Sequence, residues 1–305
     1  MAEVVDALLR VNLVASLAIL AVLLLRLPIR HRFGPEIAYG LWAAPPLAAA
    51  ATIAPLKIQS STLARPLAHL APVSLSPGLL VLWAVGLGLA VGLMWRAQSA
   101  FLKSARAGRA GPAVVGIVAP RLVMPPDDGR YTAEERMLIR AHERAHMLRK
   151  DPRAGALIAG LQCLAWFNPL VHVAAHFARL DQELACDAAV IRQHPQARAL
   201  YARTLLKTQL VAAPLPLGCY WPARSRHPLE VRVELLRRPR VDRGIEGFLL
   251  ISAGIVAAAV LAWAAEPPIV FTPPPPIWAL DGPDTGHMSV MLVTWPAPAA
   301  ASARR

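Results

Sequence analysis

Residues 8–25 read LLRVNLVASLAILAVLLL, and this stretch decides the class of protein. Its one charged residue, Arg10, lies near an end of the stretch, where its side chain can reach the lipid headgroups. About 20 apolar residues in a helix cross the roughly 30 Å hydrocarbon core of a bilayer, so we predict a membrane-spanning helix here. A basic cluster follows, which is typical of a retained span rather than of a cleaved signal peptide. The cluster comprises Arg26, Arg30 and Arg32.

The composition of the 305-residue chain agrees with an integral membrane protein. Hydrophobic residues make up 56% and charged residues 17%, and the mean hydropathy is +0.44, which excludes an ordinary soluble or disordered protein. Three widely spaced cysteines exclude a secreted disulfide scaffold. The net charge of +13 lies mainly beside apolar stretches, so we expect contacts with membrane lipids and no direct binding of nucleic acid.

Three further stretches are long and apolar enough to span, and we predict four transmembrane helices in all. The additional stretches are residues 37–55, 76–95 and 247–264. Basic residues cluster after the first and third spans and before the fourth, and short loops rich in Lys and Arg stay in the cytoplasm. The N-terminus is therefore expected outside. Pro45 and Pro46 should bend the second span.

The spans divide the chain into four expected parts. These are a three-helix transmembrane region, a cytoplasmic domain, a fourth transmembrane helix and an external proline-rich tail, at residues 1–95, 96–246, 247–265 and 266–305. The tail should be extended, because its prolines cannot continue a helix. The fold class expected is a mainly α membrane protein with its chemistry in the cytoplasmic domain.

That domain carries the motif His142-Glu143-x-x-His146 inside a segment with the signals of a helix. Thr132 is a suitable N-cap, acidic residues follow in the first turn, and apolar residues recur at helical spacing. Residues four apart share one helix face, so His142 and His146 can bind the same Zn²⁺. Glu143 can then act as the general base that takes a proton from zinc-bound water.

A catalytic zinc ion needs a third protein ligand, and a second expected helix, about residues 170–192, offers four candidates on one stripe. They are His172, His176, Glu183 and Asp187. We choose Glu183 as the ligand and Asp187, one turn on, as the outer carboxylate that orients a ligating histidine. His172 or His176 stays open as a rival ligand, and His176 is also our candidate for stabilising the oxyanion. Cys186 is expected to be a small buried residue rather than a ligand.

Residues 154–171 are also apolar and long enough to resemble a span. If they crossed, His142 and Glu183 would lie on opposite sides of the bilayer and could not share a metal. We therefore predict that this segment does not cross. It should be a core helix of the domain or a shallow membrane-embedded helix, broken at Asn168-Pro169, so the metal site would lie close to the cytoplasmic membrane surface.

Four motifs, in this order, resemble those of the BlaR/MecR-type antirepressor membrane zinc metallopeptidases, and the resemblance runs through the fourth span. The motifs are VGIVAP at residues 115–120 with Pro125, His142-Glu143-x-x-His146 with Asp151, WFNP at residues 166–169, and Asp181-x-Glu183-x-x-Cys186-Asp187. The resemblance implies that His142, His146 and Glu183 bind zinc, with Glu143 as the base. It also implies a cytoplasmic α+β gluzincin-like domain, a substrate-aligning strand over residues 114–123, and a location in the bacterial inner membrane.

The best-known members of that family carry an external penicillin-binding sensor domain after the last span, where this chain has its short tail. We therefore expect no detection of β-lactams by this chain alone. The resemblance implies a zinc metalloendopeptidase in signal transduction, whose protein substrate is a transcriptional repressor, the chain itself, or both. Residues 219–245 are then either a self-cleavage site or a basic approach to the fourth span. A non-enzymatic adaptor acting through the tail and a housekeeping membrane protease are the alternatives.

Overall fold

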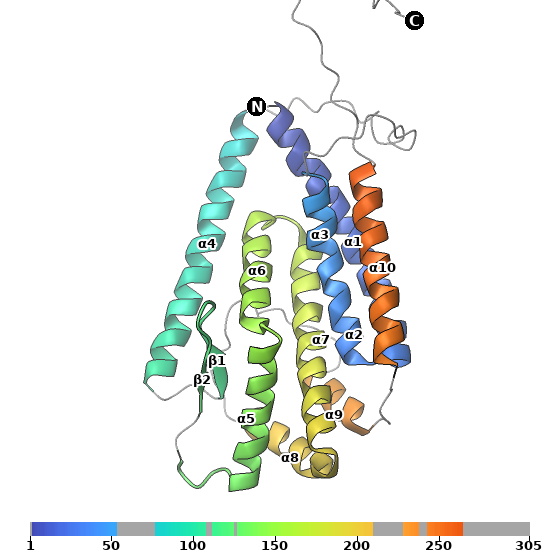
Figure 1. Ribbon diagram of the computed structural model, residues 1–305. Coiled ribbons are helices and arrows are strands. Elements are labelled where there is room, and N and C mark those ends of the chain that lie inside the picture. Colours follow the sequence, from blue (N-terminus) through green and yellow to red (C-terminus); the bar gives the residue numbers. More distant parts are fainter. Residues whose placement is uncertain are drawn as a thin grey trace, which may run out of the picture. The chain divides into compact units, whose positions relative to one another are not determined.

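The computed structural model describes residues 2–53, 77–107, 112–124, 127–209, 228–237 and 243–264 (Figure 1). All of these residues belong to the first of two units into which the chain divides, Met1–Pro267. The described part is mainly helical, as the sequence predicts. The tail that is expected to be extended, residues 266–305, lies wholly outside the described residues. Of the segment proposed for self-cleavage, residues 219–227 and 238–242 also lie outside them.

Three of the described helices are long and apolar enough to cross a membrane: α1 (Ala2–Phe33), α4 (Pro77–Arg106) and α10 (Gly244–Ala264). α1 and α10 each contain one of the predicted spans, and α4 covers the predicted span 76–95 from residue 77 onward. α1 continues well beyond residue 25 and carries its basic cluster on its last turns, where Arg26 is buried against another helix. The described part is thus mainly α, with three helices suited to a membrane, and the four predicted spans stay a prediction.

The predicted second span is not one continuous helix. The chain forms α2 (Pro35–Gly40), the 3-10 turn η1 (Leu41–Ala43) and α3 (Ala44–Ala51) in its place. Proline has no N–H to donate, and Pro45 falls in the first turn of α3, where a helix tolerates it. The 3-10 turn therefore interrupts the helical segment directly before Pro45 and Pro46, where the sequence predicts a bend, and the crossing of the membrane by this segment stays a prediction. α3 nevertheless packs along α1 and α10 (Figure 1).

The region expected to hold the chemistry contains a small hairpin and several helices. They are β1 (Ala113–Val115), β2 (Arg121–Val123), α5 (Ala133–Leu148), α6 (Asp151–Leu164), α7 (Pro169–Gln193), η3 (Pro195–Ala197), α8 (Arg198–Gln209) and α9 (Pro228–Arg237). The single strand expected over residues 114–123 is instead an antiparallel pair, with Val114 opposite Leu122. The chain reverses at Gly116, whose φ of 104° suits glycine, and a Cβ there would lie 2.7 Å from the Ala119 carbonyl oxygen.

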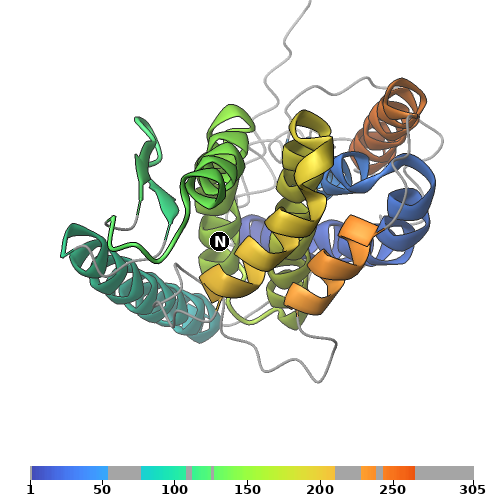
Figure 2. The ribbon, with the colours of Figure 1, turned by 90° about the horizontal axis from the view of Figure 1, so that it is seen from below.

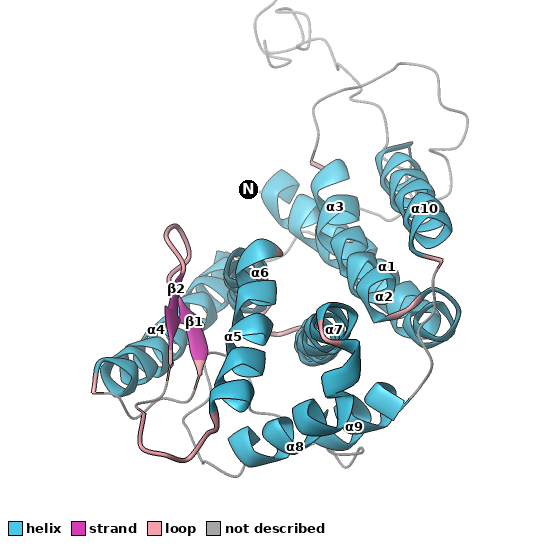
Figure 3. Ribbon diagram, turned by 60° about the horizontal axis from the view of Figure 1, so that its bottom comes forward, coloured by secondary structure: helices cyan, strands magenta, loops and turns pink. Residues whose placement is uncertain are grey.

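Helix α7 is the central element of this region (Figure 3). It packs against α2 and α1 on one side, α5 and α6 on another, and α9 beyond them. The apolar core between α5, α7, α8 and α9 comprises Leu138, Val190, Ile191, Tyr201, Leu205 and Leu236. Seen from below, α4 and the hairpin lie on the opposite side of this group from α10 (Figure 2). The central position of α7 brings side chains from α5, α8 and α9 to its polar stripe.

The apolar segment 154–171 turns back on itself. α6 ends at Leu164, and Asn168 caps α7 by accepting a hydrogen bond from the Leu170 N–H at 2.9 Å. The break falls at Asn168-Pro169, as the sequence predicts. α5 and the C-terminal half of α7 are therefore brought to the same end of the α6–α7 hairpin (Figure 1).

Candidate metal centre

Helix α5 positions the two histidines of the motif. Thr132 caps it: the Thr132 hydroxyl accepts from the Glu135 N–H at 3.2 Å, and the Glu135 carboxylate accepts from the Thr132 N–H at 2.8 Å. Lys207 of α8 donates to the same carboxylate at 2.9 Å. This capping box fixes the start of α5, and the packing of α5 on α7 brings His142 and His146 toward Glu183.

The ring nitrogens of these histidines meet a carboxylate from α7. The two Nε2 atoms lie 3.1 Å apart, and Glu183 places one oxygen 3.3 Å from Nε2 of His142 and the other 3.5 Å from Nε2 of His146. Ligands held at 2.0–2.1 Å around a tetrahedral zinc ion lie about 3.3 Å from one another. The three side chains therefore have the spacing of three corners of such a site.

The hydrogen bonds of the Nδ1 atoms fix the tautomers of His142 and His146. The Tyr201 hydroxyl donates to Asp187 at 2.7 Å, so its oxygen is free to accept from Nδ1–H of His142 at 2.8 Å. Nδ1 of His146 lies 2.8 Å from the Asp151 carboxylate, to which it donates. In the neutral form of each ring the proton stays on Nδ1, and the lone pair of Nε2 then points into the cluster, as a metal ligand requires.

Arg232 of α9 balances the charge of the carboxylates on α7. It lies 3.0 Å from Glu183 and holds both oxygens of Asp187 at 2.8 Å. Burial opposes ionisation of Asp187, but the Arg232 charge and its hydrogen bonds outweigh this and lower the pKa of Asp187 to about 2. The same guanidinium, with the two imidazoles, also lowers the pKa of Glu183, which is only partly buried, although its desolvation acts in the opposite direction. Both carboxylates are thus ionised near neutral pH.

Burial alone would lower the pKa of His142, but the hydrogen bonds and charges of Asp187 and Glu183 raise it to about 10. A metal ion bound at Nε2 has to displace that proton, so binding should release protons. The cluster is open on one side. The Glu183 side chain is 35% exposed, whereas those of His142 and His146 are 9% and 13% exposed. A catalytic ion needs such an open position.

Glu143 lies beside the cluster and is buried. Burial raises the pKa of its carboxyl, an effect that the charges of His142 and His146 oppose. The net effect raises the pKa, and a carboxylate with a raised pKa is a better proton acceptor than one in water.

Comparison with known proteins identifies a family and a relative. A sequence profile of the BlaR1 peptidase M56 family matches residues 6–76 and 104–236, well over half of the chain. The chain belongs to this family. Regulatory protein BlaR1 of Bacillus licheniformis is 32% identical over 81 residues, which are 27% of this chain and 14% of that protein. The match thus spans a small part of the relative. No solved structure matches the chain significantly.

Membership in the BlaR1 peptidase M56 family implies a membrane peptidase, and the matched residues contain every member of the cluster. The region also covers Asp187, Tyr201 and Arg232, which surround it. His142, His146 and Glu183 form one group of potential ligands whose donor atoms all lie within 4.8 Å of one another.

The rival ligands lie elsewhere. Nε2 of His172 is 3.0 Å from the Trp166 carbonyl oxygen, and its Nδ1 is 3.3 Å from Gln162, so this histidine braces the α6–α7 turn. His176 packs edge-on against Phe177 and lies near the charges of Arg26 and Arg179. Among the described residues, no hydrogen bond or ion pair joins His176 to the cluster, so its oxyanion role stays a prediction without a contact to support it.

Cys186 is fully buried, which agrees with the expectation of a small core residue. Its Sγ lies 3.3 Å from Asp151 and 3.4 Å from Nδ1 of His146. Burial and the neighbouring Asp151 carboxylate raise the pKa of the thiol, so a thiolate ligand is disfavoured. Cys186 therefore packs behind His146.

Two residues that complete the centre were missed from the sequence, Tyr201 and Arg232. No motif marks either one: Tyr201 contacts His142 across 59 residues of chain, and Arg232 contacts Glu183 across 49. Asp151 belongs to one of the four motifs, but the sequence predicted no role for it. The one signal for it was its place at the start of α6, five residues after His146.

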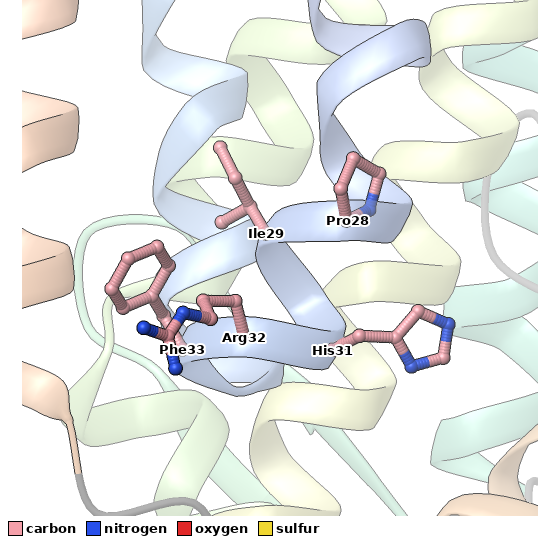
Figure 4. A pocket seen from close by; sticks show the side chains of 5 residues that line it. All are labelled: Pro28, Ile29, His31, Arg32 and Phe33. Atoms are coloured by element: carbon pink, nitrogen blue, oxygen red, sulfur yellow. The ribbon is translucent and has the colours of Figure 1, made fainter.

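A shallow hollow lies at the C-terminal end of α1, apart from this centre (Figure 4). Its lining is mainly apolar, with the side chains of Arg32 and Phe33 on one side and His31 on the other. The residues are Pro28, Ile29, His31, Arg32 and Phe33. None of them belongs to the metal-ligand group, so the hollow is not an extension of the metal centre.

Proposed function

We propose that this chain is an integral-membrane, zinc-dependent endopeptidase that acts in regulated signal transduction. Membership in the BlaR1 peptidase M56 family supports the peptidase activity and the membrane location. The observation that carries the zinc assignment is the convergence of His142, His146 and Glu183 at 3.1 to 3.5 Å.

The donor set fits zinc chemically. Two imidazoles and one carboxylate, with an open fourth position, are the ligands of a class of catalytic zinc sites. Asp187 and Tyr201 orient His142, and Asp151 orients His146. Calcium and magnesium prefer oxygen ligands, so the two ring nitrogens argue against them.

A zinc ion bound there would lower the pKa of a water molecule and polarise the carbonyl of the scissile bond. Glu143 accepts the proton from that water and passes it to the leaving amine. Its raised pKa makes it a more effective base than an exposed carboxylate. Arg232 keeps Glu183 and Asp187 ionised throughout.

The substrate we propose is a protein, either a cytoplasmic transcriptional repressor or the chain itself. Similarity to a protein named Regulatory protein BlaR1 supports a regulatory role. We further propose four membrane crossings in the bacterial inner membrane, with the N-terminus and the tail outside and residues 96–246 facing the cytoplasm. The basic residues that follow α1 and α4 and precede α10 support this orientation.

The test is Glu143→Gln in the full-length protein in membranes. We expect this variant to bind zinc as the wild type does and to lose proteolysis, because an amide has no basic oxygen to accept the proton. Proteins that accumulate intact in cells carrying the variant identify the substrate. One regulator is the expected outcome, a broad set of membrane proteins would favour the housekeeping protease, and retained proteolysis would remove Glu143 as the base.

A further inference from the structure

The α6–α7 turn is joined to the apolar part of α1. Asn168 donates to the Asn12 side-chain oxygen at 2.6 Å and to the Ser16 hydroxyl at 2.9 Å. Both acceptors lie inside the candidate span Ala7–Phe33. The turn therefore lies at the depth of residues that are themselves expected within the bilayer.

A second contact between α1 and α7 shows over what length the two helices lie side by side. Asp181 of α7, fully buried, accepts from Arg26 of α1 at 2.8 and 2.9 Å and from the indole N–H of Trp42 at 2.9 Å. From Asn12 to Arg26 is 14 residues, and from Asn168 to Asp181 is 13. At 1.5 Å per residue both intervals measure about 20 Å, so α7 runs parallel to α1 over that length.

Contacts with helix α4 place the α6–α7 turn at the same depth, independently of α1. The Trp83 indole N–H donates to the Leu164 carbonyl at 3.0 Å, and the Trp166 indole N–H donates to the Trp83 carbonyl at 3.3 Å. The Trp166 ring lies directly over Gly86, where a Cβ would overlap it. Trp83 precedes Arg96, the first charged residue of α4, by 13 residues, again about 20 Å of helix.

The hairpin has the surface that lipid requires. No Lys, Arg, Asp or Glu lies between Arg153 and Arg179. Leu157, Leu164 and Phe167 are each at least half exposed. Several polar side chains of the hairpin have protein partners: Gln162 contacts His172 at 3.3 Å and accepts from Arg179 at 3.2 Å. Polar groups persist within hydrocarbon only when they are satisfied in this way.

We propose that the α6–α7 hairpin is a re-entrant membrane element. It enters the hydrocarbon from the side of the metal centre, turns at Asn168 about 20 Å deep, and returns without crossing. Leu164 and Phe167 contact lipid acyl chains. Glu183 follows Asp181 by two residues, so the metal centre lies level with Arg26, at the membrane surface. This goes beyond the shallow embedding expected from the sequence and depends on the membrane location, not on the zinc chemistry.

Photo-cross-linking of the full-length protein in phospholipid vesicles tests this. The photoreactive residue p-benzoylphenylalanine is placed at Leu164 or Phe167 in separate variants and irradiated, and adducts are identified by mass spectrometry. Leu89, 64% exposed on the spanning helix α4, is the positive control, and Arg140, exposed on α5, is the negative control. We expect phospholipid adducts at Leu164 and Phe167 comparable with those at Leu89, and none at Arg140.

Lipid adducts at Leu89 but at neither hairpin position would overturn the proposal. Adducts with another protein at Leu164 and Phe167 would overturn it as well, since the surface would then be a protein interface. Zinc content measured on the same variants keeps the two proposals separate. Lipid adducts at the hairpin of a protein that holds no zinc would contradict the enzymatic function alone. A zinc-loaded protein without lipid adducts at the hairpin would contradict the re-entrant hairpin alone.

Discussion

Asp151 is the residue that orients His146. It is buried, accepts from Nδ1 of His146 at 2.8 Å, and is held in turn by the Tyr39 hydroxyl at 3.3 Å. The carboxylate keeps the imidazole proton on Nδ1 and makes Nε2 a better donor to a cation. It contacts no other proposed ligand of the metal, so its effect on metal binding acts through His146.

Asp151→Asn should therefore weaken zinc binding about 10- to 100-fold, since an amide of the same shape orients the ring poorly and carries no charge. Competition against a chelating dye measures the zinc affinity. Asp128→Asn, at an exposed residue of the loop before α5, is the matched control and should leave it unchanged. Equal affinities in all three proteins would show that Asp151 has no part in holding the metal.

Spacing within one helix made part of the centre predictable. His142 and His146 are four residues apart on α5, and Glu183 and Asp187 repeat the same interval on α7. Helical periodicity placed each pair on one face. Tyr201 and Arg232 were not predictable, because they reach the centre only through the packing of α8 and α9 on α7. A lone sequence carries no periodic signal for such a contact.

The N-terminal capping box of α5 stabilises the first turn of the helix that carries both histidines. Thr132→Ala removes the hydroxyl that accepts from Glu135 N–H and should cost about 1 kcal/mol of stability at this end of the helix. Hydrogen exchange of the amides in the first turn of α5 measures the loss. Thr132→Ser keeps the hydroxyl and should exchange like the wild type, and fast exchange in the serine variant would contradict the capping role.

The same turn should be sensitive to acid. The hydrogen bond from Lys207, together with that from the Thr132 N–H, lowers the pKa of Glu135 below its ordinary value. A carboxyl whose pKa is depressed on folding stabilises the protein above its unfolded pKa of about 4.3, and this contribution disappears as the pH falls through the lower folded pKa. Exchange protection of the first turn should therefore fall below about pH 4 in the wild type. Glu135→Gln should lack this pH step, and an unchanged step would assign it to another group.

Among the elements, long apolar or strongly amphipathic helices were predicted best. The spans that became α1, α4 and α10, the start of α5 and the extent of α7 follow from composition, capping and period. For the segment α2–η1–α3 the two adjacent prolines predicted a bend, but not that α2 would end at Gly40 and be followed by a 3-10 turn. The β1–β2 hairpin was missed as a pair because each strand has only three residues.

A buried ion pair ties the membrane part of the protein to the helix that carries Glu183. Asp181→Ala leaves Arg26 buried without its carboxylate partner and should lower the free energy of unfolding by about 3–5 kcal/mol. Denaturation in detergent micelles measures this change. Glu36→Gln breaks the more exposed pair between α2 and α7, with Arg192, and should cost at most about 1 kcal/mol. Equal effects of the two substitutions would show that Asp181 does not couple α1 to α7.

In the whole molecule, α5 and α7 lie side by side, so that His142, His146 and Glu183 can bind one divalent ion. Metal analysis of purified wild type, Glu183→Ala and His172→Ala proteins tests this arrangement. We expect one zinc ion per chain in the wild type and in His172→Ala, because His172 braces the α6–α7 turn, and loss of zinc in Glu183→Ala. Full zinc in Glu183→Ala together with loss in His172→Ala would contradict the assignment and move the third ligand to the histidine.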